Sequence, residues 1–253
     1  MIILLPPSEG KTPARSGRPL DLEALSFAQL APERAQVLTA LAEASAAPDA
    51  LLTLGVGPSL AADVERNTHL RTEHAAPAIQ TYTGVLYSAL GAADLDARAR
   101  RRLSGVYVSS ALFGIVGARD RIPAYRLAMK TSLPPLGGLA AWWRPRLAPV
   151  LDDAFAGQLI LDCRSAEYRR AWPGPPEAVV TVEAVTETGG KRKVISHNAK
   201  HARGALAGHL LRRAGRMPAT LEALESAAAE AFRVELRPPV GAQPAVLTLV
   251  VEG

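Results

Sequence analysis

The side chains with the greatest chemical potential lie in three short polar segments, 8–11, 165–168 and 197–203. Each segment follows a short apolar run that predicts a strand. Loops at the strand ends of a sheet can converge on one crevice, so we expect these segments to form a common cleft. Together with Arg126 they would bring four cations and two acids into it: Lys11, Arg126, Lys200, Arg203, Glu9 and Glu167.

The cations of this cleft predict an anionic ligand. Removing four cations from water beside two acids costs free energy unless a bound anion completes the pairing. Lys200 and Arg203 are neighbours on one face of a helix that we expect to begin near Asn198. Such helix N-termini attract anions, and Gly204 leaves room for another backbone or a ligand. The residues that we assign to binding phosphate or DNA are Ser8, Lys11, Gly55, Gly57, Tyr125, Arg126, Ser165, Lys200, Arg203 and Gly204.

Two residues of the second segment could also catalyse a reaction. A glutamate with a lysine and a tyrosine nearby can serve as a general acid–base set, so Glu167 and Tyr168 are our candidate catalytic residues. The alternative is that Glu167 is only the structural counter-ion of Arg126 or Arg203. The adjacent Tyr125 and Arg126 could likewise bind a phosphate or carboxylate, or pair with an internal acid. None of these patterns implies a cofactor.

Glycines near the start of the chain fail two nucleotide-binding motifs and match one DNA-binding motif. Gly10-Lys11-Thr12 lacks the first glycine of a P-loop, and the glycines at 55 and 57 lack the third glycine of a dinucleotide fingerprint. Gly55-Val56-Gly57 instead matches the turn of a helix-hairpin-helix element over about 48–67, which points backbone N–H groups at DNA phosphates. A helix C-cap and a turn would explain the same residues without DNA.

A third interpretation, metal binding, finds little support in the sequence. His197 and His201 stand four residues apart, a spacing that can chelate a metal ion. Their segment holds no Cys, Asp or Glu to complete a site, and Lys200 would repel a cation. We therefore expect no metal.

Composition excludes several classes of protein. The chain has 253 residues, a net charge of +5 and a pI near 9.6, which mildly favour a polyanionic partner. Aromatic residues make up 5%, which argues against a base-stacking platform. Cys163 is the one cysteine, so no internal disulfide can form, and its apolar surroundings predict an inert buried thiol. Without a membrane-spanning run or a signal peptide, we expect a soluble cytoplasmic protein.

The rest of the chain predicts a mixed α/β fold in a single domain, residues 1–253, because no long linker or internal repeat interrupts it. Trp142 and Trp143 are expected in the core or at an interface, and residues 110–116 are expected to form a turn or short helix. A hairpin is expected around Gly189-Gly190. The other expected strands are 2–5, 105–109, 159–162, 231–237 and 245–251, and the main helices are 32–46, 94–103, 139–156, 198–213 and 220–230.

Several segments resemble one family over nearly the whole chain. The most specific is Ala-Lys-x-Ala-Arg-Gly at 199–204, and Tyr125-Arg126-Leu127 and Ser165-x-Glu167-Tyr168 add independent support. With LLPPSEGK at 4–11 and YTGVLYSAL at 82–90, these segments are similar to those of the YaaA family, also catalogued as UPF0246 or DUF328, the peroxide stress proteins.

This resemblance implies a cytoplasmic bacterial protein that limits oxidative damage. It also implies a mixed α/β fold whose positively charged cleft and helix-hairpin-helix element bind DNA with little sequence preference. We expect a monomer, and a nucleotide or phosphate ligand, with an enzyme acting on it, remains the alternative. The chain departs from the family pattern at Thr83, where a lysine is common, and at Gly117-Ala118, where relatives often have Arg-Pro. Both departures remove positive charge.

Overall fold

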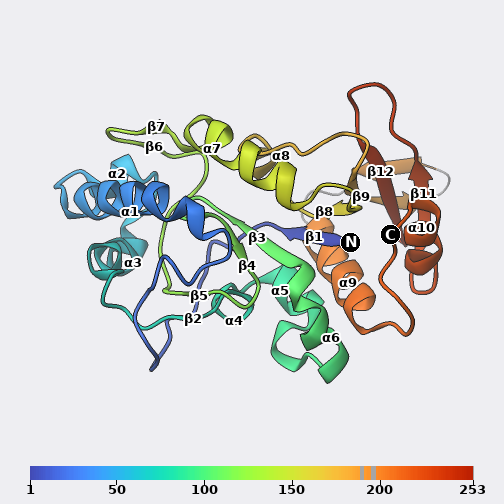
Figure 1. The fold of residues 1–253 in the computed structure, drawn as a ribbon, viewed down its shortest axis with the longest axis horizontal. Coiled ribbons are helices and arrows are strands. Elements are labelled where there is room, and N and C mark those ends of the chain that lie inside the picture. The colour runs from blue at the N-terminus through green and yellow to red at the C-terminus, as the bar shows by residue number, and fades with distance from the viewer. Residues whose placement is uncertain (189–190, 195–197, 253) are drawn as a thin grey trace.

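The centre of the computed structural model is a mixed eight-stranded sheet with helices packed on it (Figure 1). The structure describes residues 1–188, 191–194 and 198–252. The strand order is β11-β12-β9-β8-β1-β3-β4, and β10 pairs with β9. The strands are β1 (Ile2–Leu5), β3 (Val106–Ser110), β4 (Gly114–Gly117), β8 (Ile160–Asp162), β9 (Val179–Thr188), β10 (Lys191–Val194), β11 (Arg233–Arg237) and β12 (Ala245–Glu252).

Helices and two small strand pairs surround this sheet. The pairs are β2 (Ala76–Pro77) with β5 (Arg121–Ile122) and β6 (Ser132–Leu133) with β7 (Gly137–Gly138). Within the described ranges, no helix is long and apolar enough to cross a membrane. The helices are α1 (Ala31–Ala46), α2 (Ala50–Thr53), α3 (Ala61–Arg66), α4 (Ala78–Thr81), α5 (Val85–Leu90), α6 (Ala97–Arg102), α7 (Leu139–Ala154), α8 (Ala166–Arg169), α9 (Asn198–Arg212) and α10 (Leu221–Ala229).

The middle strands are buried because helices cover both faces of the sheet. All four residues of β1 are buried, as expected for a parallel strand with helices on each side. In Figure 1, α7 and α8 lie above β1 and β8, whereas α5, α6 and α9 lie below them. The predicted mixed α/β fold is thus confirmed.

One local prediction was wrong in part. Residues 110–116 were expected to form a turn or a short helix; residues 111–113 do form a turn, but Gly114–Gly117 forms β4, which pairs antiparallel with β3. Gly114 has φ +71°, and a side chain there would collide with Trp143, so the glycine permits both the turn and the close packing. Trp143 is buried as predicted, and its Nε1 donates to the Ala111 carbonyl at 2.8 Å. The turn expected at Gly189-Gly190 lies outside the described residues.

The sheet brings the three polar segments to one edge. β1 and β8 are adjacent and parallel, with Ile3 opposite Leu161, so the loops that follow them leave side by side. β9 pairs with β8 over 179–181 and with β10 over 185–188. Because β10 runs antiparallel to β9, it returns toward the end of β8, and α9 begins at the same edge.

Candidate functional site

A cleft of about 780 Å³ lies at this edge, within the size range of small-molecule sites. It contains ten of the residues predicted from the sequence: Ser8, Glu9, Lys11, Gly55, Arg126, Ser165, Glu167, Tyr168, Lys200 and Arg203. Three others, Gly57, Tyr125 and Gly204, do not line it. The full lining is 6–11, 54–56, 83–87, 126–128, Lys130, Cys163, Ser165, Glu167, Tyr168, Lys200 and Arg203.

Hydrogen bonds within the loop after β1, and from Thr83 and Tyr87 far along the chain, hold this loop in shape. The Ser8 hydroxyl donates to the Gly10 carbonyl and accepts from the Thr83 N–H at 2.9 Å. The Tyr87 hydroxyl donates to the Pro6 carbonyl at 2.8 Å. The Ser8 hydroxyl therefore shapes the loop, and its one proton is already committed.

Lys11 lies half-buried in the cleft, against aromatic rings. Its Nζ donates to the Ser8 carbonyl at 2.9 Å and lies 4.2 Å from the centre of the Tyr125 ring and 5.5 Å from that of Tyr82. Among the described residues, no carboxylate lies within 4.0 Å of Nζ. Burial, helped by the nearby Arg126 charge, lowers the pKa of Lys11 to about 7, although the ring faces favour the charged form.

Tyr125 forms the floor beneath Lys11 and does not contact the cleft itself. Its hydroxyl lies 3.0 Å from that of Tyr82 and 2.7 Å from Ser110 Oγ. Burial raises the pKa of Tyr125 well above its usual value. The role we predicted for Tyr125 in binding phosphate is therefore reduced to supporting Lys11.

Arg126 is positioned by the segment that follows α3. The buried Asn67 side chain accepts from the Arg126 backbone N–H at 2.9 Å and donates to its carbonyl at 2.9 Å. The Arg126 guanidinium reaches Glu9 Oε2 at 3.4 Å, where the Glu9 side chain is 85% exposed. A pair this exposed contributes little stability, so Arg126 can exchange its partner for a ligand anion.

Glu167 is the cleft residue whose hydrogen-bonding capacity is least satisfied. Its Oε1 is buried and has no hydrogen-bond partner among the residues that the structure describes. In the part of the chain that the structure describes, Glu167 forms no ion pair, so its interpretation as a counter-ion of Arg126 or Arg203 finds no support. The neighbouring Tyr168 is half-buried, and burial raises the pKa of its hydroxyl. An unpartnered buried carboxylate oxygen costs free energy and indicates a missing partner.

Helix α9 forms the opposite wall of the cleft. Lys200 is exposed, and Arg203 Nε donates at 3.0 Å to the carbonyl of Val182, which lies between the parts of β9 that pair with β8 and β10. Gly204 faces away: a side chain there would collide with the Leu86 carbonyl of α5. The room at Gly204 is thus taken by another backbone, one of the two possibilities that the sequence left open.

The Gly55-Val56-Gly57 turn lies between α2 and α3, and most of its amides are occupied. Gly55, with φ +64°, donates to the Leu52 carbonyl at 3.0 Å, and Val56 donates to the Leu51 carbonyl at 2.9 Å. These two bonds make a Schellman motif that ends α2. Among the described residues, Gly57 N–H has no such backbone partner. DNA binding by this turn remains a prediction and would have to use Gly57.

The structure also shows what sequence reasoning missed. Lys130 is exposed and lines the cleft, adding a fifth cation, and no motif marked it. Of the two family cations that this chain lacks, only the one at Thr83 would face the cleft. Gly117 is buried in β4, where its N–H donates to Asp120 Oδ2 at 2.8 Å. The departure at Gly117 therefore removes no charge from the site.

Two other predicted features are placed by the structure. Cys163 is buried, which confirms that part of the prediction, and burial raises its pKa to about 12; that the thiol is inert stays a prediction. His201 is exposed, whereas His197 lies outside the described residues. Within the described ranges, no three His, Cys, Asp or Glu side chains are grouped to hold a metal ion.

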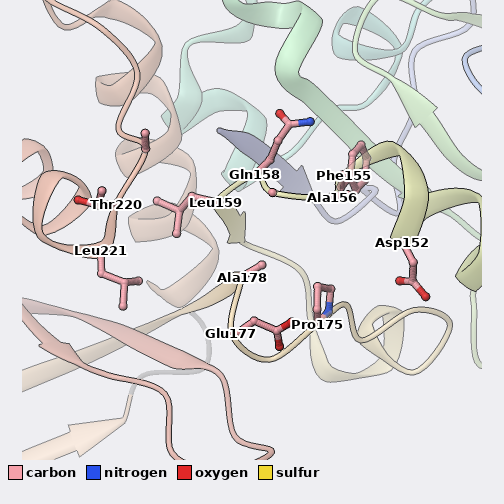
Figure 2. A pocket seen from close by; sticks show the side chains of 12 residues that line it. Asp152, Phe155, Ala156, Gln158, Leu159, Pro175, Glu177, Ala178, Thr220 and Leu221 are labelled. Carbon is pink, nitrogen blue, oxygen red and sulfur yellow. The ribbon is translucent and has the colours of Figure 1, made fainter.

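A second hollow lies between the C-terminal end of α7, β8 and the start of α10 (Figure 2). Its volume is about 690 Å³, and its polar side chains include Asp152 and Glu177. Asp152 already accepts from Trp172 Nε1 at 2.9 Å. Among the described residues, its lining holds no cation and none of the predicted site residues, so the first cleft is our candidate site.

Comparison with known proteins gives a consistent result. The family model described as peroxide stress protein YaaA matches residues 1–236. A UPF0246 protein of Streptomyces coelicolor is 40% identical over 256 residues, 99% of this chain and 98% of that protein. UPF0246 proteins of Corynebacterium efficiens and Corynebacterium glutamicum are 44% and 42% identical, each over 82% of this chain and 83% of theirs.

Proposed function

This chain belongs to the peroxide stress protein YaaA family, and we propose that it binds DNA in the cytoplasm through the basic cleft and so limits oxidative damage. One observation carries the proposal: five cations line one cleft beside two acids. The cations are Lys11, Arg126, Lys130, Lys200 and Arg203, and the acids are Glu9 and Glu167.

The electrostatics of the cleft favour a phosphodiester ligand. Lys130 and Lys200 are exposed and, within the described residues, neither forms an ion pair. When such cations neutralise DNA phosphates, the condensed counterions of DNA are released into solution, which supplies affinity with little dependence on sequence. The volume of about 780 Å³ suits one nucleotide or a short stretch of one strand, with the remaining duplex outside.

A salt titration of DNA binding tests this proposal. Replacing Lys200 and Arg203 together by alanine should weaken binding to a duplex. The slope of log K against log salt should fall by about 1.8, because each duplex phosphate contact contributes about 0.9. Fluorescence anisotropy with a labelled duplex at several salt concentrations measures both quantities.

The matched control removes two cations elsewhere. Arg100 and Arg101 are exposed on α6 and do not line the cleft, so the Arg100→Ala, Arg101→Ala double variant should keep the slope. An equal fall in both double variants would mean that DNA binds the whole basic surface and would sink the assignment to the cleft.

A second candidate function is catalysis on a nucleotide or another phosphorylated small molecule in the same cleft. The buried, unpartnered Oε1 of Glu167 favours it, because binding a phosphate alone gains nothing from a nearby carboxylate. A tight ligand would raise the melting temperature by mass action, so thermal-shift measurements with nucleotides test it. The absence of any shift would count strongly against a nucleotide substrate.

A further inference from the structure

Lys11 differs from the other cations of the cleft in its surroundings. Lys130 and Lys200 are exposed, whereas Lys11 is half-buried. Its Nζ is held by the carbonyls of Ser8, at 2.9 Å, and Glu9, at 3.5 Å. Carbonyl oxygens and ring faces surround it, with no carboxylate within 4.0 Å among the described residues. The Lys11 amine is therefore partly desolvated, whereas the exposed amines of Lys130 and Lys200 are free to contact a phosphate from solvent.

The hydrogen bonds of Lys11 are compatible with a neutral amine. A neutral –NH₂ group has two N–H donors, which is enough for both carbonyls, and its lone pair stays uncommitted. Burial lowers the pKa of Lys11 to about 7, so a large fraction of the amine is neutral near neutral pH. Exposed lysines, by contrast, keep a proton until about pH 10.4. A desolvated lysine amine is a common nucleophile toward carbonyl carbon.

The surrounding cations and Glu167 complete a site for a particular class of substrate. Arg126, Lys200 and Arg203 line the same cleft and can hold a phosphate group. The partnerless Oε1 of Glu167 offers a group for proton transfer in that space. The arrangement combines a nucleophilic amine, an acid–base group and phosphate-binding cations in one cleft.

We propose that the Lys11 amine forms a Schiff base with the aldehyde or ketone of a phosphate-bearing sugar bound in this cleft. Such a carbonyl is present in a deoxyribose of DNA that has lost its base, and also in free sugar phosphates. The inference rests on the proposed function only for the first source, since the second requires no DNA.

The reaction balances without an oxidant or reductant. The Lys11 nitrogen forms a bond to the carbonyl carbon, and one of its protons passes to the carbonyl oxygen, giving a carbinolamine. A proton from an acid, a role that Glu167 can fill, then releases the hydroxyl group as water and leaves a protonated imine. Attack by water reverses both steps and restores the amine.

Trapping with sodium cyanoborohydride tests the inference, because hydride adds to the imine carbon and leaves a stable secondary amine. The probes are a duplex with one base-free deoxyribose, the intact duplex, and free deoxyribose 5-phosphate. Peptide mass spectrometry should place the adduct on Lys11. Lys11→Arg, which keeps the charge, should lower the yield at least tenfold.

The pH profile and a control variant separate Lys11 from ordinary amines. The charged or titratable groups facing Lys11 are Glu9, Arg126, Asp63, Tyr82 and Tyr125. With these neighbours, trapping should rise with pH and reach half its maximum near pH 7. Arg100→Lys adds an exposed lysine on α6 and should leave the yield unchanged.

Each outcome decides between the two proposals. An adduct on Lys11 with either probe supports the inference, and the probe that reacts identifies the source of the carbonyl. Binding of the base-free duplex without any adduct from either probe overturns the inference and leaves DNA binding standing. An adduct on Lys130, Lys200 or the terminal amine also overturns it. Trapping of the free sugar phosphate without binding to any duplex overturns DNA binding alone.

Discussion

The buried ion pair at the end of β8 and the charged residues of the cleft differ in whether their charges have partners. Asp162 and Arg164 are both fully buried at the end of β8. Arg164 Nε and Nη2 donate to the two carboxylate oxygens at 2.9 and 2.7 Å, and Nη2 also donates to the Trp172 carbonyl at 2.9 Å. Glu167, three residues further on, has a buried oxygen with no partner.

The paired charges at β8 stabilise the fold, whereas the unpaired or weakly paired charges of the cleft are available to bind a ligand. A buried ion pair survives only when its geometry and additional hydrogen bonds offset desolvation, and the pair at β8 meets that condition. In the cleft, among the described residues, Glu167 forms no ion pair and its Oε1 has no hydrogen-bond partner, Arg126 has only an exposed partner, and Lys11 Nζ has no carboxylate within 4.0 Å. The four predictions below test whether this division is real.

Breaking the buried pair should have the largest effect. Asp162→Ala leaves the Arg164 guanidinium buried beside carbonyls without its counter-charge, so the free energy of unfolding should fall by about 3–5 kcal/mol. Denaturant unfolding measures it. Asp162→Ala combined with Arg164→Met should recover much of the loss, because no buried charge remains. A loss below about 1 kcal/mol for the single variant would show that this pair contributes no more to stability than the charges of the cleft.

Removing the Lys11 amine should change stability in a pH-dependent way. The folded-state pKa of about 7 lies below the unfolded value of 10.5, so the folded state bears the full cost of the charge below pH 7 and none above pH 10.5. Lys11→Met should therefore gain stability relative to the wild type at pH 6 and lose this advantage by pH 10. The change between these pH values should be on the order of 2 kcal/mol, because solvent reaches part of the side chain.

Thermal melts of the wild type and Lys11→Met across this pH range measure the difference in stability. The contributions of the other titrating groups are the same in both proteins and cancel. Lys130→Met is the matched control, because Lys130 is exposed in the same cleft. A pH-independent difference for Lys11→Met would show that its ammonium is well compensated, like Arg164.

Neutralising Glu167 should change stability little while altering the cleft. Glu167→Gln keeps the shape and removes a charge that has no partner, so the free energy of unfolding should stay within about 1 kcal/mol of the wild type. DNA affinity at low salt should rise, because a negative charge leaves a phosphate-binding cleft. Chemical denaturation and fluorescence anisotropy measure the two effects. A loss of stability comparable to that of Asp162→Ala would assign Glu167 a structural role.

The smallest effect should come from an exposed ion pair between β10 and β11, in which Arg192 also lies 3.6 Å from Glu187. Arg192 donates to Glu235 at 2.6 and 2.8 Å, but both side chains are more than two-fifths exposed. Arg192→Ala should leave the melting temperature unchanged within error, since solvent and salt screen such pairs. A clear decrease would show that short distance matters more than burial in this protein.

Part of the site was predictable because its signal is local. Apolar runs followed by polar loops identified β1, β8 and the approach to α9, and the spacing of Lys200 and Arg203 placed both on one helix face. The segments also carry the family resemblance. The strand in residues 110–116 was missed because one glycine within a short apolar run is equally typical of a turn and of a hairpin strand.

By itself, therefore, the sequence determined the mixed α/β class, the burial of Cys163 and most of the charged residues that line the cleft, because these depend on hydrophobic pattern and on which loops follow strands. The tertiary structure alone decided which of these residues are already satisfied. Asn67 holding Arg126, Tyr125 lying beneath Lys11 and Gly204 packing on Leu86 join positions far apart in the chain. Hydrogen-bond partners, desolvation and pKa depend on such neighbours, and no local pattern encodes them.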